Sequence, residues 1–162
     1  MTIKRMAALV AGAALLVSVA PAGAQAQART SLGPYGYGSV KLGMSAKDAK
    51  ATGKISLKMK GQCSGWDLKA HPTGRDSVGV YISKNVGVAL IFAQKGMKTP
   101  EGIGLGSTKK QLKAAYPHLK TAASGYPYTE VPGNKKAYYS FLLSKGKVYE
   151  LALGLTTQDC VN

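Results

Sequence analysis

The stretch VKLGMSAKDAK at residues 40–50 returns, little changed, as IGLGSTKKQLK at residues 103–113. Both contain a Leu-Gly pair, a hydroxyl residue two positions after the glycine, and lysines two and five positions after that hydroxyl residue. Such a hydroxyl, here Ser45 or Thr108, is typical of a helix N-cap, because it accepts a hydrogen bond from a free amide of the first turn. Each stretch therefore predicts a glycine turn followed by a short capped helix.

Both predicted helices are short. Gly53 ends the first, because glycine readily adopts the left-handed conformation at a helix end. Pro117 ends the second, because proline restricts the residue before it and brings no amide hydrogen. Isolated helices of two or three turns are marginal in water, so these helices need other elements to pack against.

Those other elements are β-hairpins. Residues 78–83 and 86–93 form one predicted hairpin and residues 137–143 and 148–155 the other, with weaker strands near 63–68 and 126–131. The predicted fold is α+β: two tandem helix-plus-antiparallel-meander units that share one sheet, with the helices on one face. The first unit spans residues 40–98 and the second residues 99–162.

The two faces of the predicted sheet differ. One carries bulky apolar side chains, and the other carries mainly glycine, alanine and serine with few charges. An antiparallel sheet can leave one face in water, but such a face usually carries charge. Three explanations stay open: a partner protein covers this face, the N-terminal segment or a loop of the chain covers it, or it is simply exposed. In the first case the predicted partner-binding residues are Tyr81, Ile91 and Tyr138, since tyrosine is common at binding surfaces.

The N-terminus predicts secretion. Lys4 and Arg5 precede an apolar run that is broken by Pro21 and followed by small residues, which is the layout of a signal peptide. We expect a secreted protein cleaved near Ala26, so that residues 1–26 are the signal peptide and 27–39 a flexible Gly/Tyr arm. An uncleaved membrane anchor is the alternative, although the run is shorter than the roughly 20 residues that a spanning helix needs.

The mature chain has two cysteines, Cys63 and Cys160. In an oxidising compartment an even number of cysteines suggests pairing, and two cysteines allow one connectivity. The sequence therefore predicts a Cys63–Cys160 disulfide, with two free thiols as the alternative.

The charge is strongly positive. Without Lys4 and Arg5, 20 basic and 7 acidic residues remain, so the mature chain carries about +13. Such a surface attracts polyanions. The scarcity of arginine argues against a specific nucleic-acid reader, because arginine provides most bidentate contacts to phosphates and bases. A solvated lysine surface is the simplest interpretation. In the alternative function, as a cationic binder of cell-wall or other polyanions, the binding residues would be Lys47, Lys50, Lys54, Lys109, Lys110 and Lys113.

The layout resembles a known family. The residues Leu42, Gly43, Met44 and Ser45, matched by 105–108, open a short helix before a meander, as in the β-lactamase inhibitory proteins of filamentous soil bacteria. A single such unit resembles the small outer-membrane-assembly lipoproteins. The resemblance implies a tandem sandwich whose concave sheet grips another protein. The chain departs from those inhibitors in its charge and in having one cysteine per half, and no stretch matches their inhibitory loops.

No motif in the sequence encodes a reaction. His71 and His118 lack a partner at a catalytic spacing, no serine lies in a G-x-S-x-G elbow, and no Cys/His cluster offers a metal site. The glycines at 102–106 lack the G-K-[ST] ending of a phosphate loop. We therefore expect a secreted non-enzymatic protein-binding module without a cofactor, including an inhibitor of an extracellular hydrolase as one form of that function.

Overall fold

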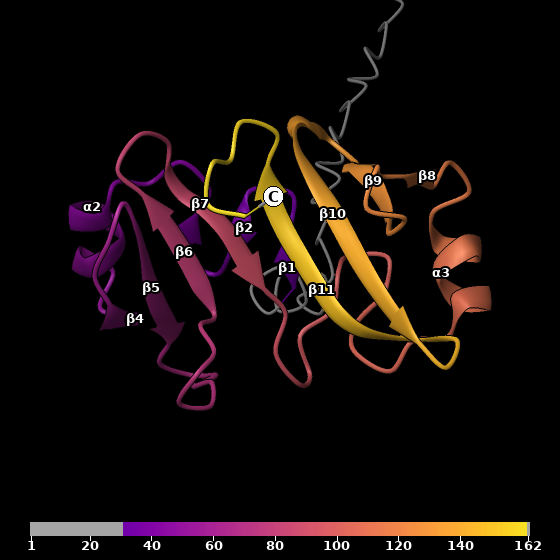
Figure 1. Ribbon diagram of the computed structural model, residues 1–162, viewed down its shortest axis with the longest axis horizontal. Helices are drawn as coiled ribbons and strands as arrows, with labels where there is room; N and C mark the ends of the chain where they lie inside the picture. The colour runs from indigo at the N-terminus through magenta and orange to yellow at the C-terminus, as the bar shows by residue number, and fades with distance from the viewer. Residues whose placement is uncertain (1–30, 162) are drawn as a thin grey trace, which may run out of the picture.

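The computed structural model describes residues 31–161, which are mostly β-structure. Eight strands form one antiparallel sheet in the order β4-β5-β6-β7-β11-β10-β9-β8 (Figure 1). The strands are β4 (Ile55–Met59), β5 (Cys63–Leu68), β6 (Val80–Ser83), β7 (Gly87–Phe92), β8 (Lys120–Thr121), β9 (Pro127–Val131), β10 (Asn134–Ser144) and β11 (Lys147–Leu155). The predicted signal peptide and its cleavage site lie outside the described residues.

The large sheet consists of two four-stranded meanders. Strands β4 to β7 form the first and β8 to β11 the second, and the two meet at their last strands, where β7 pairs antiparallel with β11. Phe92 lies opposite Ala152 at this junction, and Ile91 lies opposite Leu153. The strand order is therefore symmetric about the middle of the sheet.

The two Leu-Gly turns make the same hydrogen bonds. The amide of Gly43 donates to the carbonyl of Val88 (2.9 Å), and the amide of Val88 donates to the carbonyl of Met44 (2.8 Å). In the second half, Gly106 donates to Val148 (2.7 Å), and Val148 donates to the carbonyl of residue 107 (2.8 Å). Each repeated stretch thus attaches its turn to the last strand of its own meander.

The last hairpin of each meander also has an irregularity at the same place. In the first, Ile82 pairs with Val88 and Tyr81 with Leu90, so Ala89 is an extra residue. In the second, Leu143 pairs with Val148 and Leu142 with Glu150, so Tyr149 is the extra residue. These β-bulges make Leu90 the counterpart of Glu150 and Phe92 the counterpart of Ala152.

The hydroxyl caps are present as predicted. The Ser45 side chain accepts a hydrogen bond from the amide of Asp48 (3.1 Å) at the start of α2 (Ala46–Ala51). Thr108 and Gln111 form a reciprocal capping box at the start of α3 (Lys109–Ala115). The residues before each helix thus satisfy amides that the helix leaves free.

The predicted α+β class, with helices covering one face of the sheet, is wrong. α2 has 6 residues and α3 has 7, and the helices lie at opposite ends of the molecule (Figure 1). Each helix buries one side chain, Ala49 or Leu112. Two lysine-rich helices of this length present too little apolar surface to cover an eight-stranded sheet, so other segments must cover the core.

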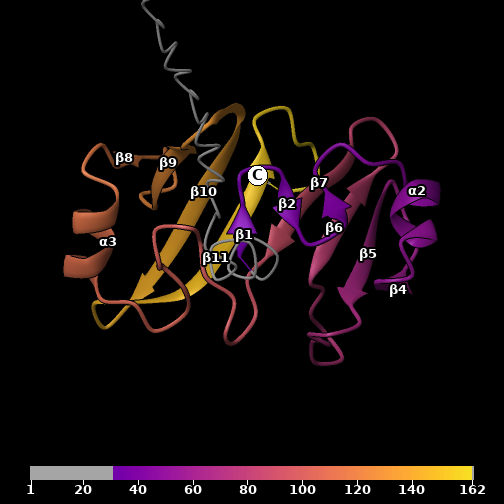
Figure 2. The same cartoon turned by 180° about the vertical axis from the view of Figure 1, so that it is seen from behind.

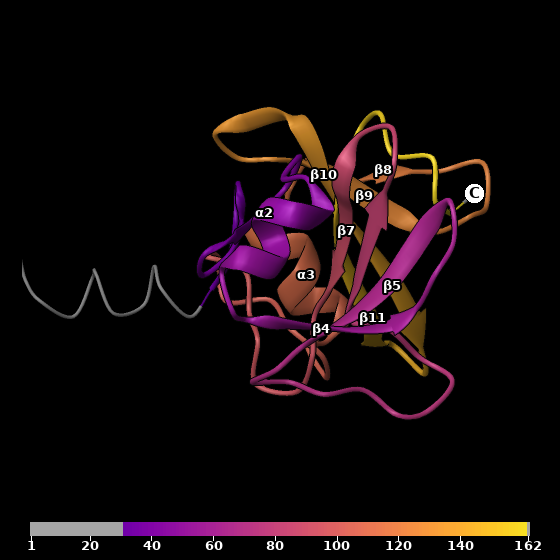
Figure 3. The same ribbon diagram turned by 90° about the vertical axis from the view of Figure 1, so that its left-hand side faces the viewer.

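The Gly/Tyr segment provides part of that cover. We expected a flexible arm at 27–39, but from Ser31 onward it forms a three-stranded sheet of β1 (Leu32–Gly33), β2 (Gly36–Tyr37) and β3 (Val40–Lys41). Leu32 and Val40 are buried in the same core as Met97 and Ile103, from the connection between the meanders. This small sheet lies on the same side of the large sheet as the two helices, as Figures 2 and 3 show.

The centre of the core is aromatic. The rings of Tyr116, Tyr139 and Phe141 lie within 6.3 Å of one another. The Tyr116 hydroxyl donates to the Glu101 carboxylate (2.5 Å) and accepts a hydrogen bond from the Thr99 hydroxyl (2.7 Å), and the Tyr139 hydroxyl donates to the carbonyl of Leu32 (2.6 Å). Burial raises the pKa of both hydroxyls, so both stay protonated donors.

Candidate functional site

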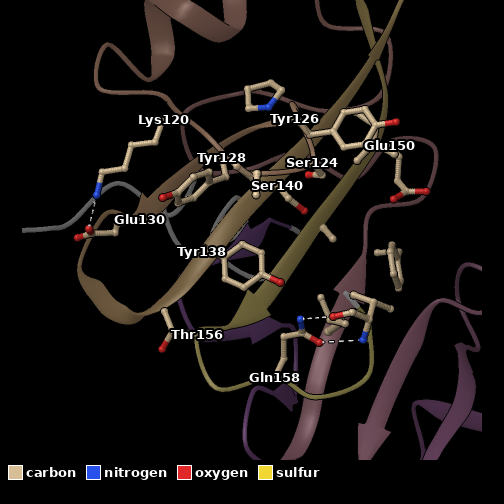
Figure 4. A pocket seen from close by; sticks show the side chains of 18 of the residues that line it. Lys120, Ser124, Tyr126, Tyr128, Glu130, Tyr138, Ser140, Glu150, Thr156 and Gln158 are labelled. Atoms are coloured by element: carbon tan, nitrogen blue, oxygen red, sulfur yellow. Dashed lines mark hydrogen bonds and ion pairs between the residues drawn. The ribbon is translucent and has the colours of Figure 1, made fainter.

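The face of the large sheet opposite the core is hollowed into an open cavity of about 860 Å³ (Figure 4). Strands β6, β7, β10 and β11 form its floor, and β9, the connection at 122–126 and the C-terminal segment at 156–161 form its rim. We call this surface the tyrosine face. Its floor residues are Tyr81, Leu90, Phe92, Lys135, Tyr138, Ser140, Leu142, Glu150 and Ala152.

The strand register explains why these side chains share a face. Tyr81 pairs with Leu90, Phe92 with Ala152, and Ala152 in turn with Ser140. Directly opposed residues in an antiparallel sheet point to the same side. The pairing therefore places large apolar side chains beside small ones, which leaves hollow space above the small residues.

Tyr138 is held in a defined position on this face. It lies opposite Gly154 on β11, and a Cβ atom at Gly154 would come within 2.9 Å of both the Tyr138 ring and the Leu90 side chain. The absence of a side chain at Gly154 thus makes room for the ring. Burial raises the pKa of the Tyr138 hydroxyl, although a hydrogen bond with Gln158 partly offsets this.

A second cavity of about 490 Å³ adjoins the first. The two share Tyr81, Phe92 and Glu150, so they form one continuous hollow across the sheet. Tyr81 and Phe92 contact each other edge to face, with ring centroids 5.9 Å apart. The loop at 72–78 and the side chain of Tyr149 border the far end of the hollow.

A buried carboxylate anchors the loop at 72–78. Asp67 accepts hydrogen bonds from the amide (3.1 Å) and the hydroxyl (2.6 Å) of Thr73, and lies 3.4 Å from the Lys58 ammonium. Lys58 also donates to the carbonyls of Gly74 (2.5 Å) and Ser77 (2.6 Å). Burial raises the pKa of Asp67, but the Thr73 hydrogen bonds and Lys58 outweigh it, so the pKa lies below its ordinary value.

The predicted Cys63–Cys160 disulfide is confirmed and anchors the opposite rim. It joins β5 to the C-terminal segment across a sequence separation of 97. Asn85 adds a hydrogen bond to the Asp159 carboxylate (2.7 Å). Hydrogen bonds from Asn85 and Ser83 lower the pKa of Asp159, so the contact persists as a charged one. Two separated rims of the tyrosine face are therefore fixed by specific contacts.

Glu150 is the one acidic side chain on the floor. It is half-buried on β11 opposite Leu142 and lines both cavities. The ion pairs within residues 31–161 are Lys58–Asp67 and Lys120–Glu130, so Glu150 forms none there. Burial raises the pKa of the Glu150 carboxyl.

The structure separates the three residues predicted to bind a partner. Tyr81 and Tyr138 line the tyrosine face. Ile91 does not: it is 0% exposed and belongs to the core. The reason is the bulge at Ala89, which reverses the alternation along β7, so that Leu90 and Phe92 take the face on which we expected Ile91.

Sequence reasoning also missed several residues of the site. Alternation along residues 86–93 predicts Leu90 and Phe92 for the bulky apolar face, and alternation along 148–155 puts Glu150 among the small and polar residues of the other face. No local pattern marks a bulge at a small residue such as Ala89.

The lysines predicted for polyanion binding do not gather at one place. All six are exposed. Lys109, Lys110 and Lys113 lie on α3 at one end of the molecule, whereas Lys47 and Lys50 lie on α2 at the other (Figure 1). Lys54 follows α2 directly. The structure thus provides two small basic groups in place of one basic surface.

The candidate catalytic and metal-binding groups lie elsewhere. Neither histidine lines the two cavities of the tyrosine face. His71 is hydrogen-bonded to the Tyr37 hydroxyl (2.8 Å), and His118 is exposed. One trio of potential metal ligands occurs within residues 31–161, Cys63, Asp159 and Cys160, but both sulfurs are in the disulfide and cannot act as thiolate ligands.

Comparisons with protein-family models, curated proteins and solved structures gave no match. In the described part of the chain, neither helix has the length and apolar character to cross a bilayer. The functional interpretation therefore depends on the geometry of the tyrosine face.

Proposed function

We propose that this chain is a secreted, non-enzymatic binding module that holds an extracellular protein on its tyrosine face. The observation that carries the proposal is an open hollow with anchored rims and with tyrosine, phenylalanine and leucine side chains on its floor. The charged residues Lys120, Glu130, Lys135 and Glu150 also line it. Such an aromatic floor is typical of protein interfaces, where aromatic residues are enriched at the core.

The described part of the chain covers this face only in part: Leu90 and Ala152 on the floor are buried, whereas Tyr81, Tyr138 and Glu150 stay partly exposed. The N-terminal strands β1 to β3 pack on the opposite, core side, and the C-terminal segment only borders the hollow. Of the three explanations for the weakly charged face, covering by the N-terminal segment is therefore excluded for residues 31–39. Half-buried tyrosines at the floor favour a partner over a plainly exposed face, because such side chains supply most of the energy at many interfaces.

Secretion is supported by two independent features. The N-terminal basic, apolar and small-residue regions have the order of a signal peptide. The Cys63–Cys160 disulfide suits an oxidising compartment, where such bonds persist. The partner is accordingly a protein outside the cytoplasm.

Internal duplication also supports a binding role. The matching turn-to-strand hydrogen bonds, the matching bulges and the symmetric strand order are what two copies of one turn-plus-meander unit would give. We propose that residues 40–98 and 99–162 are these copies. Joined at their last strands, they create a wider continuous face than either could alone.

Inhibition of an extracellular hydrolase is the form of binding that the resemblance to the β-lactamase inhibitory proteins suggests. The hollow could receive a protruding loop of an enzyme, and the anchored rims would resist deformation on binding. Enzyme inhibition remains a proposal about the partner, and the binding surface is the same for an inhibitory and a non-inhibitory partner.

The competing function is binding of cell-wall or other polyanions by lysine. A chain with 22 basic and 7 acidic residues will attract such polymers. The separation of the two lysine groups disfavours one specific polyanion site, since each group offers only three lysines. Such binding would weaken steeply with salt.

The test is capture from natural material. The mature protein is immobilised, exposed to the secreted proteins and wall fragments of the producing cell, and eluted with a salt gradient. We expect one stoichiometric protein that is retained near 1 M salt. Release of mixed anionic material at moderate salt, with no retained protein, would refute the proposal in favour of the lysine surface.

A further inference from the structure

We propose that Glu150 receives a lysine or arginine side chain from a protruding loop of the protein partner. This inference rests on the proposed function and adds the chemistry of the contact at the centre of the tyrosine face. It assigns Glu150 as the residue that selects the charge of the bound group.

Glu150 lies where the two cavities meet. It is a lining residue of both, together with Tyr81 and Phe92. Tyr149 interacts electrostatically with both Glu150 and Tyr126, which places these three side chains in one cluster. Figure 4 shows the Glu150 carboxylate at the edge of the larger cavity, below the ring of Tyr126. A group bound at the centre of the hollow would therefore meet the carboxylate and aromatic rings together.

The fold does not require a carboxylate at this position. The matching bulges make Leu90 the counterpart of Glu150 in the first meander. Leu90 is 1% exposed, so the first meander buries an apolar side chain at the position that matches Glu150. Glu150 instead puts a negative charge on a largely apolar surface, where partial burial disfavours ionisation.

The carboxylate also lacks an internal counterion. Although the chain carries 22 basic residues, none forms an ion pair with Glu150 between Ser31 and Val161. The contrast is Glu130 on the rim, which is paired with Lys120 at 2.9 Å. A half-buried carboxylate without a counterion can gain one from a partner, and the pair would be shielded from water once the hollow is covered.

The aromatic rings favour the same kind of ligand. A guanidinium or ammonium group is attracted to the faces of tyrosine and phenylalanine as well as to a carboxylate. An arginine would suit the site best, because its planar group can stack on a ring while it donates to the carboxylate. A second copy of this chain is an unfavourable source of the cation, because two chains of about +13 repel each other.

The test uses blocked tripeptides as stand-ins for the partner loop. The probes are Ac-Leu-Arg-Leu-NH2, Ac-Leu-Gln-Leu-NH2 and Ac-Leu-Glu-Leu-NH2, titrated into the isotopically labelled mature protein while amide chemical shifts are recorded. We expect the arginine probe to shift the amides of Phe92, Tyr126 and Glu150. Its affinity should exceed that of the glutamine probe by about tenfold, the effect of 1.4 kcal/mol.

Two variants test the role of the carboxylate. Glu150→Gln keeps the size of the side chain, and Glu150→Leu copies the counterpart position, so that a folding defect in one does not stop the test. Both should abolish the preference for arginine. Glu130→Gln is the matched control, because it removes a carboxylate from the rim of the same cavity, and it should leave the preference unchanged.

Three results would overturn the inference. The first is that the arginine and glutamine probes shift the same amides equally. The second is that the arginine preference survives in both Glu150 variants. The third is that no probe shifts these amides even at a large excess of peptide over protein. None of these would refute the proposed function. That proposal fails separately, when capture from the secreted proteins yields no salt-resistant partner.

Discussion

At the residue scale, single side chains fix segments that are far apart in the sequence. Tyr139 on β10 is 0% exposed, and its hydroxyl donates to the carbonyl of Leu32 on β1. This bond joins the small N-terminal sheet to the large one. Without it, the buried carbonyl would lose its partner, and an unsatisfied buried polar group is costly.

Replacing Tyr139 with phenylalanine should lower the free energy of unfolding by about 1–2 kcal/mol, because it leaves the Leu32 carbonyl without its side-chain donor. Urea denaturation followed by circular dichroism would measure the change. Tyr149→Phe is the control: this side chain is 51% exposed, so its substitution should have little effect. Equal stability of the Tyr139→Phe variant and the wild type would show that the bond does not hold the small sheet.

A second prediction concerns Gly154, above which the Tyr138 ring lies. Gly154→Ala should cost about 1–3 kcal/mol of stability and displace the ring, because the new methyl group would overlap Tyr138 and Leu90. Denaturation measures the first effect, and the chemical shifts of the Tyr138 ring report the second. Gly74→Ala, where a methyl group has open space, should do neither. An unshifted Tyr138 ring would mean that Gly154 does not determine its position.

The candidate site was only partly predictable from the sequence at this scale. Tyr81 and Tyr138 could be placed on one face because simple alternation holds around them. Ile91 was misplaced and Phe92 was missed, because a bulge shifts every later residue of a strand to the other face. Glu150 lies on the face that alternation predicts for it, but the sequence does not show that its carboxylate lacks a counterion among residues 31–161. The bulge at Ala89 lies in the pairing of β6 with β7, and no glycine or turn residue marks this position in the sequence.

At the scale of elements, the sequence predicts helix caps and hairpins better than it predicts which segments pack over the core face of the large sheet. The caps at Ser45 and Thr108 and the two main hairpins depend on local chemistry, so they could be predicted. The small sheet of β1 to β3 could not, since each strand has only two residues and exists through tertiary contacts. The repeated stretches correctly predict two helices. They do not predict that the helices cover the sheet, because each helix has only one buried side chain, Ala49 or Leu112.

The loop at 72–78 gives a prediction about pH. The folded state lowers the pKa of Asp67, so its charged form contributes stability that is present near neutral pH and is lost as the pH falls below about 4. Asp67→Asn should therefore reduce the free energy of unfolding at pH 6 and flatten its decline between pH 6 and pH 2.5. Urea denaturation at several pH values would measure this.

Asp76→Asn provides the matched control, because Asp76 is exposed and forms no ion pair within the described chain. It should retain the acid decline of the wild type. If Asp67→Asn shows the same decline as Asp76→Asn, the buried Asp67–Thr73–Lys58 contacts do not contribute to acid stability.

At the scale of the whole molecule, the disulfide connects the first meander to the end of the second. Cys63 and Cys160 enclose most of both meanders, and the bond holds the C-terminal rim of the tyrosine face beside β5. A protein-binding surface benefits from such preorganisation, because less conformational freedom is lost on binding.

Replacing both cysteines with serine should lower the free energy of unfolding by about 4 kcal/mol, as expected for a closed loop of roughly this length. Hydrogen exchange at residues 156–161 should also become faster, because the tail loses its covalent anchor. Guanidinium denaturation and exchange mass spectrometry would measure the two effects. Unchanged exchange in the tail would show that hydrogen bonds such as Asn85–Asp159 suffice to hold the rim.

The central claim is that the tyrosine face binds a protein, and the most direct test is the affinity of the captured partner for variants of that face. Calorimetry would compare the wild type with Tyr81→Ala/Tyr138→Ala and with the matched surface control Lys109→Ala/Lys110→Ala. We predict that the tyrosine variant loses at least about a hundredfold in affinity, a few kcal/mol, while the lysine variant changes little. Unchanged affinity of the tyrosine variant, together with a large loss in the lysine variant, would contradict the account and place the binding site on the lysine-rich ends of the molecule.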